Sequence, residues 1–207
     1  MPQAAKEFLL QDSLWKSTLA EFREKACGTD PLPAGVAISA VSASLALALL
    51  AKVLDIAVRR KNFSGDRQRL TALLDAAREE SARLAQLADD DVHAFQEYME
   101  CKRQGRDPNE AVRNAIQVPM NAARSAVRGL ELCSEAIGML QGLTAADVGS
   151  AASLLSGAVR AFLLSANAND RTMRSDETFS RQVAAECRKL ELGAQRWAET
   201  VTSKLRA

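Results

Sequence analysis

A long uncharged segment constrains this chain more than any other feature. No charged residue occurs between Ala34 and Ala51, and the apolar pattern continues to Val58 across Lys52 and Asp55. A segment of this kind forms a helix that is apolar on all sides, either at the centre of a soluble bundle or across a membrane. Its serines lower the hydrophobicity, and the other segments are amphipathic. The soluble bundle is therefore the favoured interpretation, with the membrane span as the alternative.

The remaining segments also have helical patterns, so the sequence predicts an all-α protein. Apolar residues recur at intervals of three and four, and caps or breaks separate the segments. Helices are expected over residues 14–26, 34–61, 65–102, 108–140, 145–168 and 176–204. Their expected N-caps include Ser64, Asp107, Thr144 and Ser175. We predict one domain over residues 1–207, a single bundle of about six helices with two apolar inner helices.

Composition narrows the class of protein further. Aromatic residues make up 4% of the chain and hydrophobic residues 47%, mostly Ala, Leu and Val, which suits close helix packing. The net charge is +1 with both signs interleaved, so no nucleic-acid surface is expected. The four cysteines are widely spaced and predict reduced thiols. Charges at Lys6, Glu7 and Asp12 interrupt any apolar run after Met1, so we expect no signal peptide and a cytoplasmic location.

Asp91 is the first candidate for chemistry. The two preceding aspartates can face solvent, but Asp91 stacks with Ala88 and Phe95 on the apolar seam of its helix. One interpretation is a slight rotation that turns Val92 inward and leaves Asp91 at the boundary. The other is a carboxylate in a partly apolar cleft, where burial raises its pKa toward the range useful for acid–base catalysis.

Other charged residues have a structural and a functional interpretation each. Arg160 is the only charge in a long apolar stretch and either extends to solvent, forms an ion pair or contacts an anion. Asp147 fits the third position of a helix start. Lys61 lies near a helix C-terminus, where cations are favoured, and could attract an anionic ligand. His93 is the only histidine and is expected to be exposed, so no histidine-based metal site is expected.

Six short motifs extend over nearly the whole chain. They stand at residues 32–37 (LPAGVA), 55–63 (DIAVRRKNF), 91–95 (DVHAF), 118–120 (VPM), 146–151 (ADVGSA) and 160–169 (RAFLLSANAN). Their order and spacing resemble the cyclodeaminase/cyclohydrolase family. This family includes bacterial methenyltetrahydrofolate cyclohydrolases and the C-terminal domain of formiminotransferase-cyclodeaminase.

The resemblance implies a helical homodimer with a folate site near the subunit interface. It implies chemistry on the one-carbon unit that bridges N5 and N10 of tetrahydrofolate, with a tetrahydrofolate derivative as substrate and neither metal nor prosthetic group. Asp91 would be the catalytic acid–base or electrostatic group. The residues expected to bind substrate are Pro33, Gly35, Ala37, Lys61, Asp147, Arg160 and Asn169.

The favoured function is a methenyltetrahydrofolate cyclohydrolase, with two alternatives. These are a formiminotetrahydrofolate cyclodeaminase and a non-catalytic folate-binding or scaffold paralogue. The last is motivated by departures from the family pattern, in which three glycines and a serine precede the apolar helix. Here that stretch is Ala34-Gly35-Val36-Ala37. Glycine allows close backbone approach to a ligand, which Val36 does not allow cheaply.

Overall fold

The structure, a computed structural model, describes residues 13–173 and 175–206. The prediction based on Lys6, Glu7 and Asp12 lies outside these ranges. Within them the chain is helical and contains no β-strand, which confirms the all-α prediction. The elements are η1 (Leu14–Lys16), α2 (Leu19–Cys27), α3 (Gly35–Arg59), α4 (Arg67–Gln104), α5 (Asn109–Ala136), η2 (Ile137–Met139), α6 (Leu143–Met173) and α7 (Glu177–Arg206).

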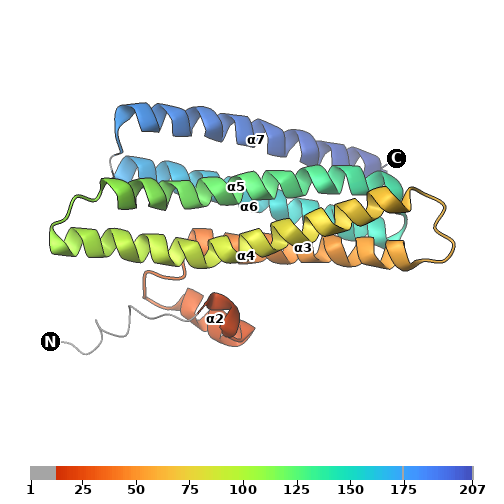
Figure 1. Ribbon diagram of the computed structural model, residues 1–207, viewed down its shortest axis with the longest axis horizontal. Coiled ribbons are helices and arrows are strands. Elements are labelled where there is room, and N and C mark those ends of the chain that lie inside the picture. Colours follow the sequence, from red (N-terminus) through yellow and green to blue (C-terminus); the bar gives the residue numbers. More distant parts are fainter. Residues whose placement is uncertain (1–12, 174, 207) are drawn as a thin grey trace.

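Helices α3 to α7 lie side by side as one elongated bundle, whereas α2 lies outside it (Figure 1). Consecutive helices of the bundle run in opposite directions, so α3 is antiparallel to both α4 and α6. Helix α3 packs between α4 and α6, and α5 contacts α4, α6 and α7. The start of α3 therefore lies beside the C-terminal halves of α4 and α6.

The two apolar helices each keep an exposed face. Helix α5 buries more than half of its residues, a larger share than α3 or α6, because it contacts three neighbours. By length and composition α3 and α6 could each cross a membrane. In the bundle, 61% of the most apolar part of α3 is buried and 44% of that of α6. The burial of α3 fits the bundle interpretation, and the exposed part of both helices needs a separate explanation.

Two helices begin at an aspartate rather than at the predicted serine. Asp66, and not Ser64, caps α4, since its carboxylate accepts a hydrogen bond from the backbone N–H of Arg69 at 2.9 Å. Asp176, and not Ser175, accepts from the backbone N–H of Phe179 at 2.9 Å at the start of α7. Each segment offers two capping residues within two positions. Sequence spacing alone does not choose between them.

Three other helix starts also differ in detail. The first predicted helix is divided, because Thr18 forms a capping box with Glu21 and α2 begins after it. Helix α6 begins at Leu143, so Thr144 lies inside its first turn. Asp107 still serves the start of α5, where its carboxylate accepts from the backbone N–H of Asn109 at 3.1 Å. These shifts leave the order and number of the predicted helices unchanged.

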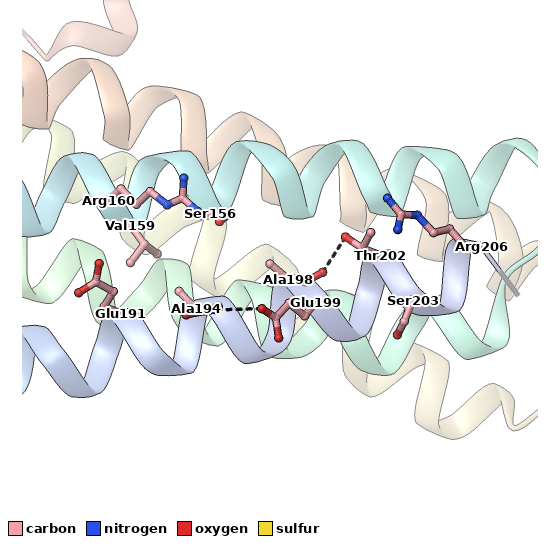
Figure 2. A pocket seen from close by; sticks show the side chains of 11 residues that line it. Ser156, Val159, Arg160, Glu191, Ala194, Ala198, Glu199, Thr202, Ser203 and Arg206 are labelled. Atoms are coloured by element: carbon pink, nitrogen blue, oxygen red, sulfur yellow. Dashed lines mark hydrogen bonds between the residues drawn. The ribbon is translucent and has the colours of Figure 1, made fainter.

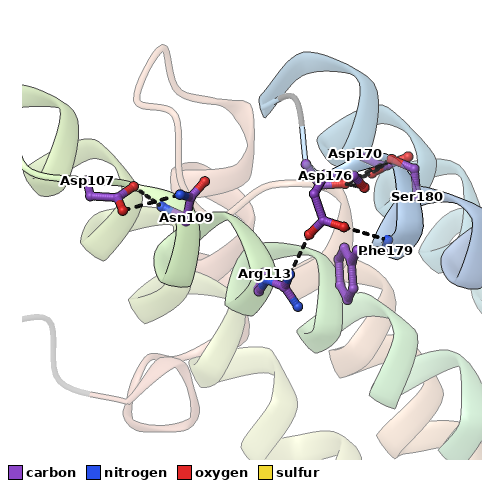
Figure 3. Close-up of polar contacts among 8 residues, drawn as sticks. Asp107, Asn109, Arg113, Asp170, Asp176, Phe179 and Ser180 are labelled. Atoms are coloured by element: carbon purple, nitrogen blue, oxygen red, sulfur yellow. Dashed lines mark hydrogen bonds and ion pairs between the residues drawn. The ribbon is translucent and has the colours of Figure 1, made fainter.

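Polar contacts join three helices at the end of the bundle where α7 begins (Figure 3). Arg113 of α5 forms an ion pair with Asp176, which also caps α7. Asp170 of α6 accepts a hydrogen bond from the hydroxyl of Ser180 at 2.8 Å. These contacts fix α5, α6 and α7 relative to one another near the C-terminal end of α6.

Candidate functional site

Helix α3 begins without a capping side chain of its own. Its N-cap is Ala34, which cannot accept a hydrogen bond, and no side-chain cap forms there. The first backbone N–H groups of a helix have no partner within the helix. The carboxylate of Asp91, on α4, accepts a hydrogen bond from the backbone N–H of Ala37. A side chain from α4 therefore supplies what the first turn of α3 lacks.

Asp91 is buried at this position. Only 9% of its surface is exposed, and Val92 is buried beside it, so the helix turns both residues inward. Burial raises the pKa of Asp91 from 3.8 to about 6, and the hydrogen bond from Ala37 partly opposes this rise. The physical cause is desolvation, which disfavours the charged form of a carboxylate. Of the two interpretations of Asp91, the structure agrees with the buried carboxylate.

The predicted loop residues lie together at this helix start. Pro33 and Ala37 are buried, while Gly35 is exposed. A Cβ atom on Gly35 would lie 3.9 Å from Oγ of Ser165, which places α6 on the other side of the same turn. Beyond Asp91, α4 continues for about 20 Å. The start of α3 is thus flanked by α4 on one side and α6 on the other.

Asp89 has a role that the sequence did not indicate. It was expected to face solvent, but its carboxylate accepts a hydrogen bond from the backbone N–H of Leu14 at 2.8 Å. The indole N–H of Trp15 donates to the backbone carbonyl of Ala85 at 2.8 Å. The segment that precedes α2 is therefore held along α4, within two turns of Asp91. No local pattern predicts contacts between residues so far apart in the chain.

Asn169 has a structural contact in this chain. Its side-chain amide donates to the backbone carbonyl of Ala115 at 2.9 Å. In an uninterrupted helix this carbonyl would accept from the residue four positions later, but that residue is Pro119, which has no N–H. Asn169 thus supplies the donor that α5 lacks. Its amide nitrogen is used by the fold, and its role in substrate binding stays a prediction.

Asp147 and Lys61 lie far from Asp91 within one chain, contrary to their grouping by sequence. Eighteen residues of α6 separate Asp147 from Ser165, a span of about 27 Å. Lys61 follows the C-terminal end of α3, whose 25 residues span about 37 Å from Gly35. The antiparallel order of α3 and α6 places both residues at the opposite end of the bundle.

Arg160 faces a different part of the surface. It is exposed and lines a groove of about 530 Å³ between α6 and α7 (Figure 2). Side chains of α7 with both charges, Glu191, Glu199 and Arg206, line the same groove. Arg160 precedes Ser165 by five residues, which turns the two side chains about 140° apart on α6. A single chain therefore does not direct Arg160 toward Asp91, and the role of Arg160 in substrate binding stays a prediction.

Other reactive groups contribute little to this site. His93 is exposed, as predicted. Over residues 13–173 and 175–206, no three His, Cys, Asp or Glu side chains gather as metal ligands would. Cys133 is buried, and burial raises its pKa to about 12, so its thiol stays protonated and unreactive. Among the residues that the structure describes, Asp91 is the buried carboxylate, and its pKa lies near neutral pH.

The fold and the site define a class of protein. It is an antiparallel helical bundle in which a buried carboxylate faces the uncapped start of an apolar helix. A carboxyl group with a pKa near 6 gives up and takes protons readily near neutral pH. The sequence found the carboxylate through its position on the apolar seam. It did not predict that this carboxylate, on α4, accepts from the first turn of α3. The alanine at the N-cap of α3 was a signal that a partner from elsewhere is needed.

Comparison with known proteins identifies the family. A model of the family described as formiminotransferase-cyclodeaminase matches residues 18–189. The chain belongs to this family, which confirms the resemblance found in its motifs. A crystal structure of formiminotetrahydrofolate cyclodeaminase from Thermotoga maritima has the same fold, with a TM-score of 0.86 and 23% identity over 93% of this chain and 97% of that chain. A search of curated protein sequences gives no match.

Proposed function

We propose that this protein is an enzyme of tetrahydrofolate one-carbon chemistry, and specifically a methenyltetrahydrofolate cyclohydrolase. Membership of the family supports the substrate class. The observation that carries the proposal is Asp91, a buried carboxylate with a pKa of about 6 at the start of α3. The reaction needs one group that moves protons at one carbon, and Asp91 has the required properties.

In the proposed reaction, water attacks the methenyl carbon that bridges N5 and N10 of the substrate. With a pKa of about 6, Asp91 is about 90% ionised at pH 7 and accepts a proton from the attacking water. Protonated Asp91 then donates to N5 as the bond between this nitrogen and the carbon breaks. The hydroxyl proton leaves to solvent, and the product is 10-formyltetrahydrofolate. The negative charge of Asp91 also stabilises the cationic methenyl group before water adds.

The altered loop, residues 34–37, exposes only small residues to solvent. Val36 and Ala37 replace family glycine and serine, but both side chains are buried in the bundle. Ala34 and Gly35 are the exposed residues of this stretch. The substitutions therefore do not place a large side chain over the site. This favours an enzyme over a non-catalytic paralogue.

A second candidate reaction is that of a formiminotetrahydrofolate cyclodeaminase. It is favoured by the name of the structural relative from Thermotoga maritima. There N10 attacks the formimino carbon, the bond to the formimino nitrogen breaks, and ammonia leaves. Asp91 would take the proton that N10 loses and donate it to the leaving nitrogen. Both reactions use the same carboxylate and differ in the substrate presented to it.

A parallel assay of the two substrates tests these proposals. The loss of methenyltetrahydrofolate absorbance reports the cyclohydrolase, and ammonia release from formiminotetrahydrofolate reports the cyclodeaminase. Asp91→Asn is the control, because it keeps an oxygen for the N–H of Ala37 while removing the ionisable group. Hydrolysis that Asp91→Asn abolishes supports the first candidate. Tight folate binding without turnover of either substrate would instead indicate the non-catalytic paralogue.

We also propose that the protein acts as a cytoplasmic homodimer. Large apolar side chains are exposed on the adjacent helices α3 and α6, namely Ile38, Leu45, Ile56, Leu154 and Leu164. Exposed apolar side chains on neighbouring helices favour association with another protein surface. Sedimentation at micromolar concentration should give a stable dimer, and a stable monomer would contradict the proposal. The cytoplasmic location stays a prediction from the sequence.

A further inference from the structure

The segment over residues 13–33 leaves the bundle and returns to it at the two helices that Asp91 joins. Its first anchor is Leu14, which is buried and whose backbone N–H donates to the carboxylate of Asp89 at 2.8 Å. Asp89 lies two residues before Asp91 on α4. The second anchor is Pro33, which is buried next to the start of α3. Asp91 accepts its hydrogen bond from that same helix start. Both ends of the segment are therefore fixed close to Asp91.

Between its two anchors the 13–33 segment has few contacts with the bundle. No residue from Trp15 to Pro31 is buried, and α2 lies outside the bundle (Figure 1). The half-buried Phe22 is the α2 side chain that packs against the core, and Leu19, one turn earlier, is 77% exposed. A region with few buried contacts opens locally at a low cost in free energy. Helix α2 can therefore move while both anchors stay in place.

Helix α2 is also stabilised by its own residues. The side chain of Thr18 accepts a hydrogen bond from the backbone N–H of Glu21 at 3.2 Å, and the carboxylate of Glu21 accepts from the backbone N–H of Thr18 at 2.7 Å. This capping box satisfies the helix start without any partner from the bundle. Exposed residues 28–31 follow the helix. A helix that carries its own cap moves as one body and does not need to unfold.

The start of α3 offers this segment a surface to cover. Ala34 and Gly35 are exposed there, whereas Asp91 has only 9% of its surface exposed. Sites for small molecules bury most of the surface of the ligand. Segments that close over a bound substrate supply such burial and separate the reacting groups from bulk water. The 13–33 segment combines the two properties that this role requires, because its ends are fixed at the site and its middle has few contacts to give up.

We infer that the 13–33 segment is a strap that closes over the Asp91 site when a ligand is bound, and that Asp89 is the positioning residue that fastens this strap. The class of ligand, a tetrahydrofolate derivative, rests on the proposed function. Asp89 acts through the backbone N–H of Leu14 and touches no reacting atom. The indole N–H of Trp15, which donates to a backbone carbonyl of α4 at 2.8 Å, fastens the same end. Closure holds the substrate against Asp91 and keeps bulk water from the reacting carbon.

Limited proteolysis tests the closure without any assay of turnover. Arg23 and Lys25 are exposed on α2 and are sites for trypsin. The probe is 5-formyltetrahydrofolate, a stable tetrahydrofolate that carries a one-carbon group. It should slow cleavage at these two sites several-fold, while cleavage at the exposed Arg106, between α4 and α5, stays unchanged as the internal control. Mass spectrometry of the fragments separates the sites. Bound probe without protection of α2 overturns the strap, and so does protection that follows protein concentration alone, which would place α2 against a second copy.

Variants of Asp89 test its role as the positioning residue. Asp89→Ala should raise KM by about 3- to 10-fold, the size expected when one hydrogen bond is lost, and should leave kcat nearly unchanged because Asp91 is intact. Asp89→Asn keeps an oxygen for the N–H of Leu14 and should restore the wild-type KM. Asp90→Ala is the matched control, since the carboxylate of Asp90 accepts from Gln86 within the same helix at 2.9 Å. An unchanged KM in Asp89→Ala, or an equal rise in Asp90→Ala, overturns the role of Asp89.

The strap and the proposed function fail in different ways. A protein that neither binds nor converts tetrahydrofolates contradicts the proposed function. The fastening by Asp89 is then measured without ligand, because its hydrogen bond to Leu14 is present in the free protein. Asp89→Ala should speed tryptic cleavage within α2, whereas Asp89→Asn and Asp90→Ala should not. Unchanged cleavage in Asp89→Ala overturns the fastened strap, whichever reaction the protein catalyses.

Discussion

Two places in this bundle lack a backbone partner, and a side chain from another helix supplies each. At the start of α3, the N–H of Ala37 bonds to the carboxylate of Asp91. In α5, Pro119 leaves the carbonyl of Ala115 without its helical donor, and Asn169 donates to it at 2.9 Å. Both are polar contacts between helices, and both side chains were candidates for the site.

The difference between them is whether the side chain is ionisable. A neutral amide that donates to a carbonyl is a satisfied group, and its contact stabilises the fold. A buried carboxylate that receives one backbone hydrogen bond is still destabilised in its charged form, as the raised pKa of Asp91 shows. A neutral side chain that completes a helix, such as Asn169, indicates a structural role. An ionisable side chain in the same position, such as Asp91, indicates a candidate functional group. Four measurements test whether the two side chains differ in this way.

The largest expected effect is on turnover. Asp91→Asn should lower kcat by about 10²- to 10⁴-fold, because the general acid–base is removed. The variant should stay folded, since the asparagine oxygen can still accept from Ala37. Asn169→Ala is the matched comparison and should keep kcat within a few-fold of wild type, assayed below its unfolding transition. Equal losses in the two variants would contradict a distinction between them.

The next effect is the pH dependence of stability. The folded-state pKa of Asp91 is about 6 and its ordinary value is 3.8, so its contribution to stability is fully present below pH 3.8 and is lost as the pH rises through 6. This shift corresponds to about 3 kcal/mol. Urea unfolding of wild type and Asp91→Asn between pH 4 and 8 should show wild type losing stability relative to the variant as the pH rises. Parallel curves would exclude a strongly shifted carboxylate.

A smaller effect is expected at Pro119. Asn169→Ala should lower the free energy of unfolding by about 1–3 kcal/mol, because the carbonyl of Ala115 loses its donor. In a Pro119→Ala background the backbone N–H of residue 119 can donate to that carbonyl. Asn169→Ala should then lower the free energy of unfolding by much less. A double-mutant cycle by urea denaturation measures the difference. Additive effects of the two substitutions would show that Asn169 does not compensate for the proline.

The smallest effect is expected where a helix carries its own cap. Asp66→Ala should lower stability by about 1 kcal/mol, because α4 loses one exposed capping hydrogen bond. Activity should not change, since Asp66 lies at the opposite end of α4 from Asp91. Thermal unfolding and the kinetic assay together check this. A large loss of activity would mean that local caps also matter to the site.

Local sequence patterns predicted the helices because a helix is set mainly by neighbours three and four positions apart. They also indicated that Asp91 could face inward, since it lies on the same stripe as Ala88, but they left open a position at the boundary. The caps of α4 and α7 were misplaced by one or two residues because two suitable side chains stood next to each other. The contact of Asp89 with Leu14 was missed, since the two residues are seventy-five positions apart.

Residue types and their spacing were sufficient to predict the all-α class, the order of the helices and the family, and they indicated the acid that is buried. Each of these depends on residue types and short spacings, which the chain carries locally. Which of the candidate residues lie together depends instead on how the helices pack. Antiparallel packing sets Gly35 and Ser165 together, turns Asn169 to the carbonyl beside Pro119, and sends Asp147 and Lys61 to the far end. The direction in which one helix passes another is fixed by packing across the whole bundle, and no short motif specifies it.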